Sequence, residues 1–259
     1  MKQTIKLSIA FLLMAALFAA CVPDQDIAGA RWSDTWIYTE EGEQFTVNLD
    51  LVLNTESTGT LFLNETHSGM PMGGGFAIPV NYTWDDNHGT ATGTVDLTEL
   101  YMAKTVLPKG GQAVTLDMDY TKVEGFRVTL GGELGQWFGI VNHTLQRKEY
   151  VKNPALEGTT WLAEWDEQDE DWGGELGVHH YRYEMNFTSG TAAVLNMQYT
   201  DPDGDTMDDR WNVNVSMTNG LGTTSIYFDG ETAQGGFYLP DAQHLTFCDG
   251  ASFIQFSKQ

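Results

Sequence analysis

The sequence contains only two cysteines, Cys21 and Cys248, in 259 residues. If Cys21 is modified, as argued below, Cys248 has no partner in the chain and no disulfide supports the fold. The hydrophobic cores must then be large enough to be stable alone. Hydrophobic residues make up 41% of the chain, with 8 Trp, 10 Tyr and 13 Phe, which is enough to build such cores and excludes a disordered chain.

Basic residues are also scarce, with 13 Lys and Arg against 36 Asp and Glu. Two of the 13 bases, Lys2 and Lys6, lie before Cys21, which leaves 11 bases against 36 acids and a formal charge of −25. Such an acidic surface repels phosphate backbones, so we expect no nucleic-acid partner. Cations and neutral polar ligands such as sugars remain compatible with it. The simpler interpretation is that the charge keeps an exported protein soluble.

The apolar run Leu7–Phe18 is shorter than the roughly 20 residues that a membrane-spanning helix needs. It follows two lysines and precedes Ala19-Ala20-Cys21, so residues 1–20 are a predicted signal peptide and are excluded from the fold. The segment resembles a bacterial lipoprotein signal peptide, in which the cysteine thiol receives diacylglycerol. The resemblance implies that Cys21 is lipidated. The alternative is an ordinary secretory signal in which Cys21 is incidental.

A lipidated cysteine implies a membrane partner through an N-terminal lipid anchor. Acyl chains contribute about 0.8 kcal/mol per buried CH₂, so several chains hold a protein on a bilayer without a spanning helix. Val22 follows Cys21, where Asp is associated with inner-membrane retention in some Gram-negative lipoproteins. By this resemblance we expect the outer membrane, on its periplasmic or cell-surface face.

One sequence pattern occurs twice, at Ile27–Trp32 and at Leu156–Trp161. In both copies an aliphatic residue is followed two positions on by Gly and three later by Trp, and a second Trp follows four positions further. The match recurs downstream, where Gly59–Leu63 aligns with Gly190–Val194. The pattern indicates two diverged copies of one β-rich unit.

Short strands with closely spaced turn signals are predicted throughout both copies. In Gln44–Leu53 apolar and polar residues alternate, which is typical of a half-buried strand. Ser68–Gly75 has the composition of a mobile loop, and Trp137–Leu145 is predicted to be a strand. No long amphipathic helix is expected. The predicted fold is all-β, with two tandem antiparallel β-barrel or sandwich units: a tether at 21–28, a first domain at 29–148, a linker at 149–155 and a second domain at 156–259.

The start of the second unit, Gly158-Thr159-Thr160-Trp161, resembles the lipocalin-like barrels of Gram-negative lipoproteins. In lipocalins, a Gly and a Trp at the first strand close one barrel end, and a late Arg packs over the indole. The resemblance implies that Trp32 and Trp161 close their barrels, with Arg147 and Lys258 as the late cations. We favour a core role for both indoles over a ligand role. A small barrel either holds one ligand or is filled by side chains.

The stretch Asp201–Asp209 is the strongest candidate for a metal site. Calcium takes roughly six to eight oxygen ligands, which carboxylates at alternate loop positions can supply. The Asp-x-Asp-Gly-Asp start resembles thrombospondin type 3 and EF-hand-like loops, which implies Ca²⁺ ligands at Asp201, Asp203, Asp205, Asp208 and Asp209. The alternative is an acidic hairpin turn, since Asp and Gly favour turns for backbone reasons alone.

A second acidic stretch, residues 166–171, is flanked by Trp165 and Trp172. Aromatic rings can cover the apolar faces of a sugar while nearby acids accept its hydroxyl hydrogens. Trp165 and Trp172 are therefore the predicted ligand-binding residues of a glycan site. The alternative is a solvated loop.

Strand alternation places the neighbours His179 and His180 on opposite faces, so they cannot chelate one ion together. On the face of His180 we expect a cross-strand charge network that includes Arg182 and Glu184. No nucleophile turn, phosphate loop or zinc-protease motif is present. We therefore expect a non-enzymatic lipoprotein that binds a small apolar molecule or a glycan. The alternative is a structural or adhesion module stiffened by calcium.

Overall fold

The computed structural model of the chain describes residues 27–40, 42–67, 70–96, 111–121, 124–170, 176–228, 231–248 and 253–259. The predictions for the signal peptide, for lipidation of Cys21 and for Trp172 concern residues outside these ranges. Within them, no helix has the length and apolar character needed to cross a membrane.

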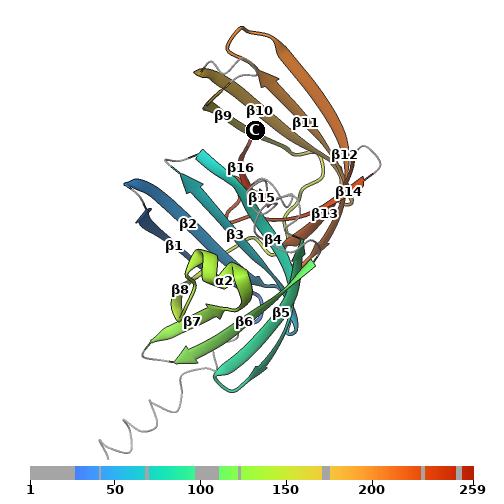
Figure 1. The fold of residues 1–259 in the computed structure, drawn as a ribbon. Helices are drawn as coiled ribbons and strands as arrows, with labels where there is room; N and C mark the ends of the chain where they lie inside the picture. The colour runs from blue at the N-terminus through green and yellow to red at the C-terminus, as the bar shows by residue number, and fades with distance from the viewer. Residues whose placement is uncertain are drawn as a thin grey trace, which may run out of the picture.

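Barrel 1 is a closed antiparallel barrel in which each strand pairs with the next and β1 also pairs with β8 (Figure 1). A short helix, α2 (Gly132–Phe138), lies between its last two strands. The strands are β1 (Ala30–Glu40), β2 (Glu43–Leu53), β3 (Thr58–His67), β4 (Met70–Asp85), β5 (His88–Asp96), β6 (Gly111–Thr121), β7 (Gly125–Leu130) and β8 (His143–Lys148).

Barrel 2 repeats this topology, with β9 pairing with β16 to close it. The prediction of two tandem antiparallel β units is confirmed, and both units are barrels and not sandwiches. The strands are β9 (Thr160–Glu170), β10 (Leu176–Ser189), β11 (Ala192–Thr200), β12 (Thr206–Thr218), β13 (Leu221–Phe228), β14 (Glu231–Tyr238), β15 (His244–Cys248) and β16 (Phe253–Lys258).

Alternation along each strand separates the core from the outer wall. In β6, Val114, Leu116 and Met118 are buried in the core of barrel 1, and the residues between them are exposed. β2 departs from this pattern at its end, where Asp50–Leu53 are buried on both faces. The second buried face indicates that something covers the outer wall of barrel 1 at this point.

The repeated glycines have the same conformational role in both barrels. Gly29 and Gly158 lie in turns with φ of 67° and 74°, a left-handed conformation that favours glycine. Each donates its N–H to the end of the second strand of its barrel, to the carbonyls of Leu53 and Phe187 respectively. The repeated sequence pattern therefore marks the entry of the chain into each barrel.

The two repeated indoles belong to the cores, with exposed fractions of 2% for Trp32 and 1% for Trp161. Trp32 stacks on Phe126, with ring centroids 4.4 Å apart. In barrel 2, Lys258 holds its Nζ 5.7 Å from the centroid of Trp161, as the lipocalin resemblance implies. In barrel 1, Arg147 is opposite Trp32 in the strand register, but its side chain is exposed.

Two local predictions were wrong. Ser68–Gly75 was expected to be a loop, but β4 begins at Met70 and pairs with β3 across a register shift. The predicted strand at Trp137–Leu145 begins within α2, and β8 starts only at His143. Leu134 and Phe138 lie one turn apart on α2 and are both buried in the core of barrel 1, which favours a helix here.

A third apolar cluster joins the outer walls of the two barrels. Its buried members are Val52, Phe62, Tyr150, Leu221, Tyr238 and Cys248. A Cβ added to Gly236 of β14 would lie 3.2 Å from Ala77 and 3.4 Å from Phe62, so glycine allows a tighter contact between the barrels than a larger residue would. Figure 1 shows β4 beside the last strands of barrel 2. This contact is what buries the outer face of β2.

A polar link lies within this interface. The Asp50 carboxylate accepts a hydrogen bond from Arg31 Nε at 2.7 Å and another from the hydroxyl of Tyr238 at 2.6 Å. The Arg31 guanidinium also lies 4.9 Å from the centroid of the Tyr238 ring. Beside them, Asn54 donates to the Thr218 carbonyl. Barrel 1 therefore supplies a buried carboxylate, and barrel 2 supplies one of the hydrogen bonds that this carboxylate accepts.

We predict that Asp50→Ala lowers the free energy of unfolding by about 3–5 kcal/mol, because it leaves the Arg31 charge without its acid in a buried site. Tyr238→Phe removes one hydrogen bond to a charged group and should cost about 1.5–3 kcal/mol. Denaturant unfolding measures both values. Asp117→Ala on the exposed face of β6 is the control and should change stability by at most about 0.5 kcal/mol. A loss at Asp50 no larger than at Asp117 would contradict the link.

Burial raises the pKa of Tyr238 well above its ordinary value, and the adjacent Asp50 raises it further. Burial also raises the pKa of Tyr150. A raised folded-state pKa means that stability is fully present below the unfolded pKa of about 10 and is lost above it, at up to about 1.4 kcal/mol per pH unit for each group. We expect the alkaline loss of stability to be shallower in Tyr238→Phe, as measured by unfolding between about pH 9 and pH 11. Parallel curves would contradict this expectation.

Candidate ligand-binding site

The ends of the two barrels that lie away from Trp32 and Trp161 are built differently. In barrel 1, residues 131–142 connect β7 to β8 and include α2, whose Leu134 and Phe138 are buried in the core. In barrel 2, the equivalent connection between β15 and β16 consists of residues 249–252 alone. Four residues cannot form a helix of the length of α2. Among the described residues of barrel 2, no helix takes the place of α2.

At this end of barrel 2 the inward-facing residues of β9, β10 and β11 are mostly aromatic. We call this set the aromatic mouth, and it comprises Trp165, His179, Tyr181, Tyr183 and Tyr199. All but His179 are partly exposed, although they lie on the same strand faces as fully buried residues such as Trp161 and Met185. Along β9 and β11 the exposure of the inward-facing residues rises towards this end, whereas on β10 the outermost ring, His179, is buried beneath its neighbours' rings.

Strand register brings these rings into contact. Trp165, Tyr181 and Tyr199 occupy directly paired positions on β9, β10 and β11. Trp165 stacks on Tyr181 with centroids 5.2 Å apart and planes 9° apart, and it meets Tyr183 edge-on at 5.0 Å. Tyr199 lies 5.2 Å from Tyr181 and 5.4 Å from the ring of His179. Such cross-strand aromatic pairs hold one another in position.

Two polar atoms in the aromatic mouth are buried without a hydrogen-bond partner among the described residues. They are Nε1 of Trp165 and Nε2 of His179. The other ring nitrogen of His179, Nδ1, is hydrogen-bonded to the Tyr199 hydroxyl. An unsatisfied buried polar group costs about 1–3 kcal/mol, so a bound molecule that pairs with these nitrogens would recover that energy.

The structure changes the expected setting of Trp165. Because side chains alternate on β9, the indole lies inside the barrel and Asp166 points outward, where its Oδ1 is 2.8 Å from His180 Nδ1. Asp166 therefore faces away from the indole, whereas Glu167 lies on the same face of β9 as Trp165 and pairs with His179 across the strands. The partners of Trp165 are the rings of β10, which sequence analysis missed. The signal was present as aromatic side chains at alternate positions 179, 181 and 183.

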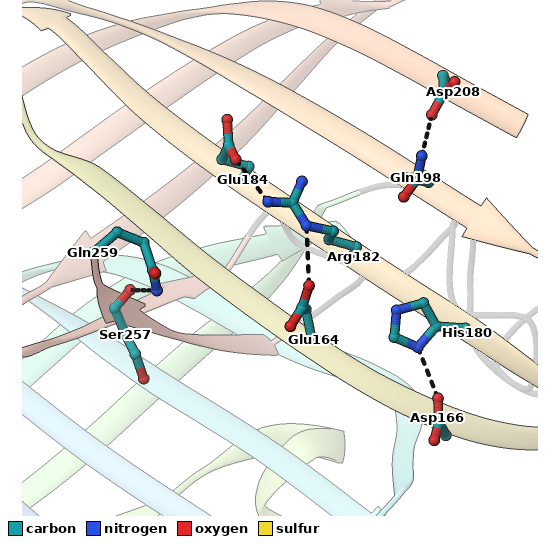
Figure 2. Close-up of polar contacts among 9 residues, drawn as sticks. All are labelled: Glu164, Asp166, His180, Arg182, Glu184, Gln198, Asp208, Ser257 and Gln259. Carbon is teal, nitrogen blue, oxygen red and sulfur yellow. Dashed lines mark hydrogen bonds and ion pairs between the residues drawn. The ribbon is translucent and has the colours of Figure 1, made fainter.

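The charge network on the outer wall is confirmed (Figure 2). Arg182 donates from Nε to Glu164 at 3.0 Å and from Nη2 to Glu184 at 2.9 Å. Hydrogen bonds from Asn186 and from Arg182 lower the pKa of Glu184. His180 belongs to this wall and His179 to the interior, as alternation predicts. The outer wall is thus a set of paired charges over β9 and β10.

The predicted calcium ligands do not form a group around one point. Asp201 accepts the backbone N–H of Asp205 at 2.8 Å, and its own N–H donates to the Asp205 carbonyl at 2.9 Å, so these residues form a hydrogen-bonded turn. Asp208 accepts from Gln198 on the outer wall, while Asp209 points to the other face of β12. Within the described ranges, no three acid, His or Cys side chains are placed to hold a metal ion. Asp203 is exposed.

Comparison with known proteins gives no family assignment. No protein-family model matches the chain, and no curated protein matches its sequence.

The hydrogen-bonded turn predicts that calcium does not stabilise the protein. We expect the same Tm in EDTA and in excess calcium, and the same response in a variant with Asp203→Asn and Asp205→Asn. A ligand present at one hundred times its dissociation constant adds about 2.7 kcal/mol, a shift that thermal melting detects easily. A calcium-dependent rise in Tm that the double variant loses would establish the loop as a metal site.

Proposed function

We propose that this protein is a non-enzymatic lipoprotein that binds a small molecule in the aromatic mouth of barrel 2. The observation that supports this proposal is the pair of unpartnered buried nitrogens, on Trp165 and His179, within a set of partly exposed rings. Ligand sites in proteins are mostly apolar and aromatic, with a few polar groups that fix orientation. The aromatic mouth has both properties.

The chemistry of the aromatic mouth limits the ligand. Indole and phenol rings pack against a flat apolar molecule or against the C–H face of a sugar. Trp165 Nε1 is a donor only, so the ligand supplies an acceptor to it. Tyrosine hydroxyls at the same end offer further polar contacts to sugar hydroxyls. A neutral apolar molecule with one acceptor, or a glycan, fits these demands best.

The proposed location is the outer membrane, through lipid attached at Cys21. The sequence before Cys21 supports this part of the proposal by its resemblance to lipoprotein signals. Acyl chains would hold the protein on the bilayer, and the excess of 36 acids over 13 bases would keep the barrels away from anionic head groups.

A second candidate function is a structural or adhesion module. The buried cluster and polar link between the barrels favour it, since they fix the two units relative to each other. Stiffening by calcium would be part of this second function, and the comparison of Tm in EDTA and in calcium described above tests it. A module of this kind needs no ligand in the aromatic mouth, so a binding experiment separates the two candidates.

We predict that the neutral fluorescent probe N-phenyl-1-naphthylamine binds the purified full chain saturably. Tyr181→Ala should weaken binding by about two- to tenfold, the effect of removing one stacked ring worth about 0.5–1.5 kcal/mol. Fluorescence titration measures both affinities. A parallel calorimetric screen of neutral mono- and oligosaccharides tests the glycan alternative.

The matched control is Val178→Ala, which removes an apolar side chain from the outer face of the same strand, where Val178 is 57% exposed. It should leave the probe affinity unchanged. Circular dichroism confirms that each variant keeps its strand content. Absence of binding by both the probe and the sugars in the folded protein would reject the proposed function and favour the structural module.

A further inference from the structure

The outer wall of barrel 2 contains a pocket of about 290 Å³ over β10, β11 and β12. It is lined by the outward-facing residues Arg182, Asn196, Gln198, Asp208 and Arg210, together with Met197 and Asp209. Register explains this grouping: Gln198 pairs with both Arg182 and Asp208 across the strands, and Asn196 pairs with Arg210. The pocket therefore lies on the opposite side of the sheet from the aromatic mouth and shares no ring with it.

The two arginines of this pocket differ in their partners. Arg182 is held by two acids, Glu164 at 3.0 Å and Glu184 at 2.9 Å (Figure 2). Arg210 is exposed, and among the described residues its side chain has neither a hydrogen bond nor an ion pair. The acid nearest to it in sequence on the same face, Asp208, accepts a hydrogen bond from Gln198 at 3.0 Å. One guanidinium in the pocket is thus unpaired.

The chain has 36 acids and 13 bases. Of the other four arginines, Arg31, Arg127 and Arg182 each have an acid within 3.0 Å, and Arg147 is exposed like Arg210 but lies in barrel 1, outside any such pocket. The planar fork of Arg210 matches a carboxylate and can bind it through two parallel hydrogen bonds. The amide of Asn196 opposite it carries no charge, so no side chain paired with Arg210 on β11 competes for that fork.

We propose that this pocket binds an acidic sugar, with the sugar carboxylate on Arg210 and its hydroxyls on Gln198 and Asp208. Amides and carboxylates suit hydroxyls because together they donate and accept hydrogen bonds. The volume is close to the lower limit of about 300 Å³ for ligand pockets, which suits one sugar ring. No aromatic side chain lines the pocket, so a neutral sugar has no ring to stack on and the carboxylate supplies most of the affinity.

The surrounding acids restrict the ligand further. Glu164 and Glu184 are paired with Arg182, but Asp208 and Asp209 line the pocket and repel additional negative charge. Screening limits the influence of more distant acids to about 8 Å at physiological salt. A single carboxylate is therefore favoured over a phosphate or a polyanion. The pocket therefore favours a ligand that carries one carboxylate and several neutral hydroxyls.

The test is isothermal titration of the purified full chain with sodium D-glucuronate and with D-glucose. We expect saturable binding of D-glucuronate that is at least about tenfold tighter than that of D-glucose, since hydrogen bonds to a charged group carry the difference. Arg210→Gln should weaken D-glucuronate binding by about tenfold or more. Arg210→Lys, which keeps the charge without the fork, should have an intermediate affinity.

The matched control is Arg147→Gln, which removes an exposed arginine from barrel 1 and should leave D-glucuronate binding unchanged. Tyr181→Ala should also leave it unchanged, which separates this site from the aromatic mouth. Equal affinity for D-glucose and D-glucuronate would overturn the proposal. So would absence of saturable D-glucuronate binding, or an Arg210→Gln variant that binds as tightly as the parent.

Discussion

The Asp50 carboxylate is the point on which the joint arrangement of the two barrels depends. It lies on an outer wall where a strand would normally face water, and it is shielded there by the other barrel. Burying a charge is costly unless the charge is paired and hydrogen-bonded. Arg31 from the same barrel supplies the opposite charge, and Tyr238 from the other barrel supplies a hydroxyl. Separation of the barrels would return this group to water and break the second of these bonds.

The inner and outer walls of barrel 2 have different chemical environments. The inner wall near the aromatic mouth consists of aromatic side chains that are partly or fully buried. The outer wall over β10–β12 is polar and charged. Alternate residues of the same strands supply both, as with His179 inside and His180 outside. A single sheet can therefore present two surfaces of different chemistry, because a side chain on one face does not reach the other.

Sequence patterns predicted the features that depend on local order. Alternation gave the strands, and the repeat of Gly and Trp located the start of both barrels. Features that depend on distant contacts were missed. The seven-residue helix α2 is stabilised by burial of Leu134 and Phe138, and an isolated helix of that length is not stable. Tyr238, the partner of Asp50 in barrel 2, lies 188 positions away, and no local pattern identifies it.

The candidate site was predicted in part for the same reason. Trp165 was recognised as a ligand-binding candidate, but the rings that contact it are set by the register of β9, β10 and β11, and its sequence neighbour Asp166 lies on the opposite face. The acidic stretch at Asp201 resembles a metal loop in its spacing, yet the Asp201 carboxylate accepts the backbone N–H of Asp205 and Asp208 accepts from the side chain of Gln198. Spacing along the chain does not determine which way the carboxylates point.

Cys248 gives the interface between the barrels a further property. It is the single thiol of the described residues, it is fully buried, and it lies among Val52, Phe62 and Tyr238 at the junction. A thiol reacts with a modifying reagent only when the reagent can reach it. Alkylation of Cys248 therefore requires the junction between the barrels to open or the end of β15 to unfold locally. Slow alkylation of Cys248 in the folded protein would therefore show that the junction between the two barrels seldom opens.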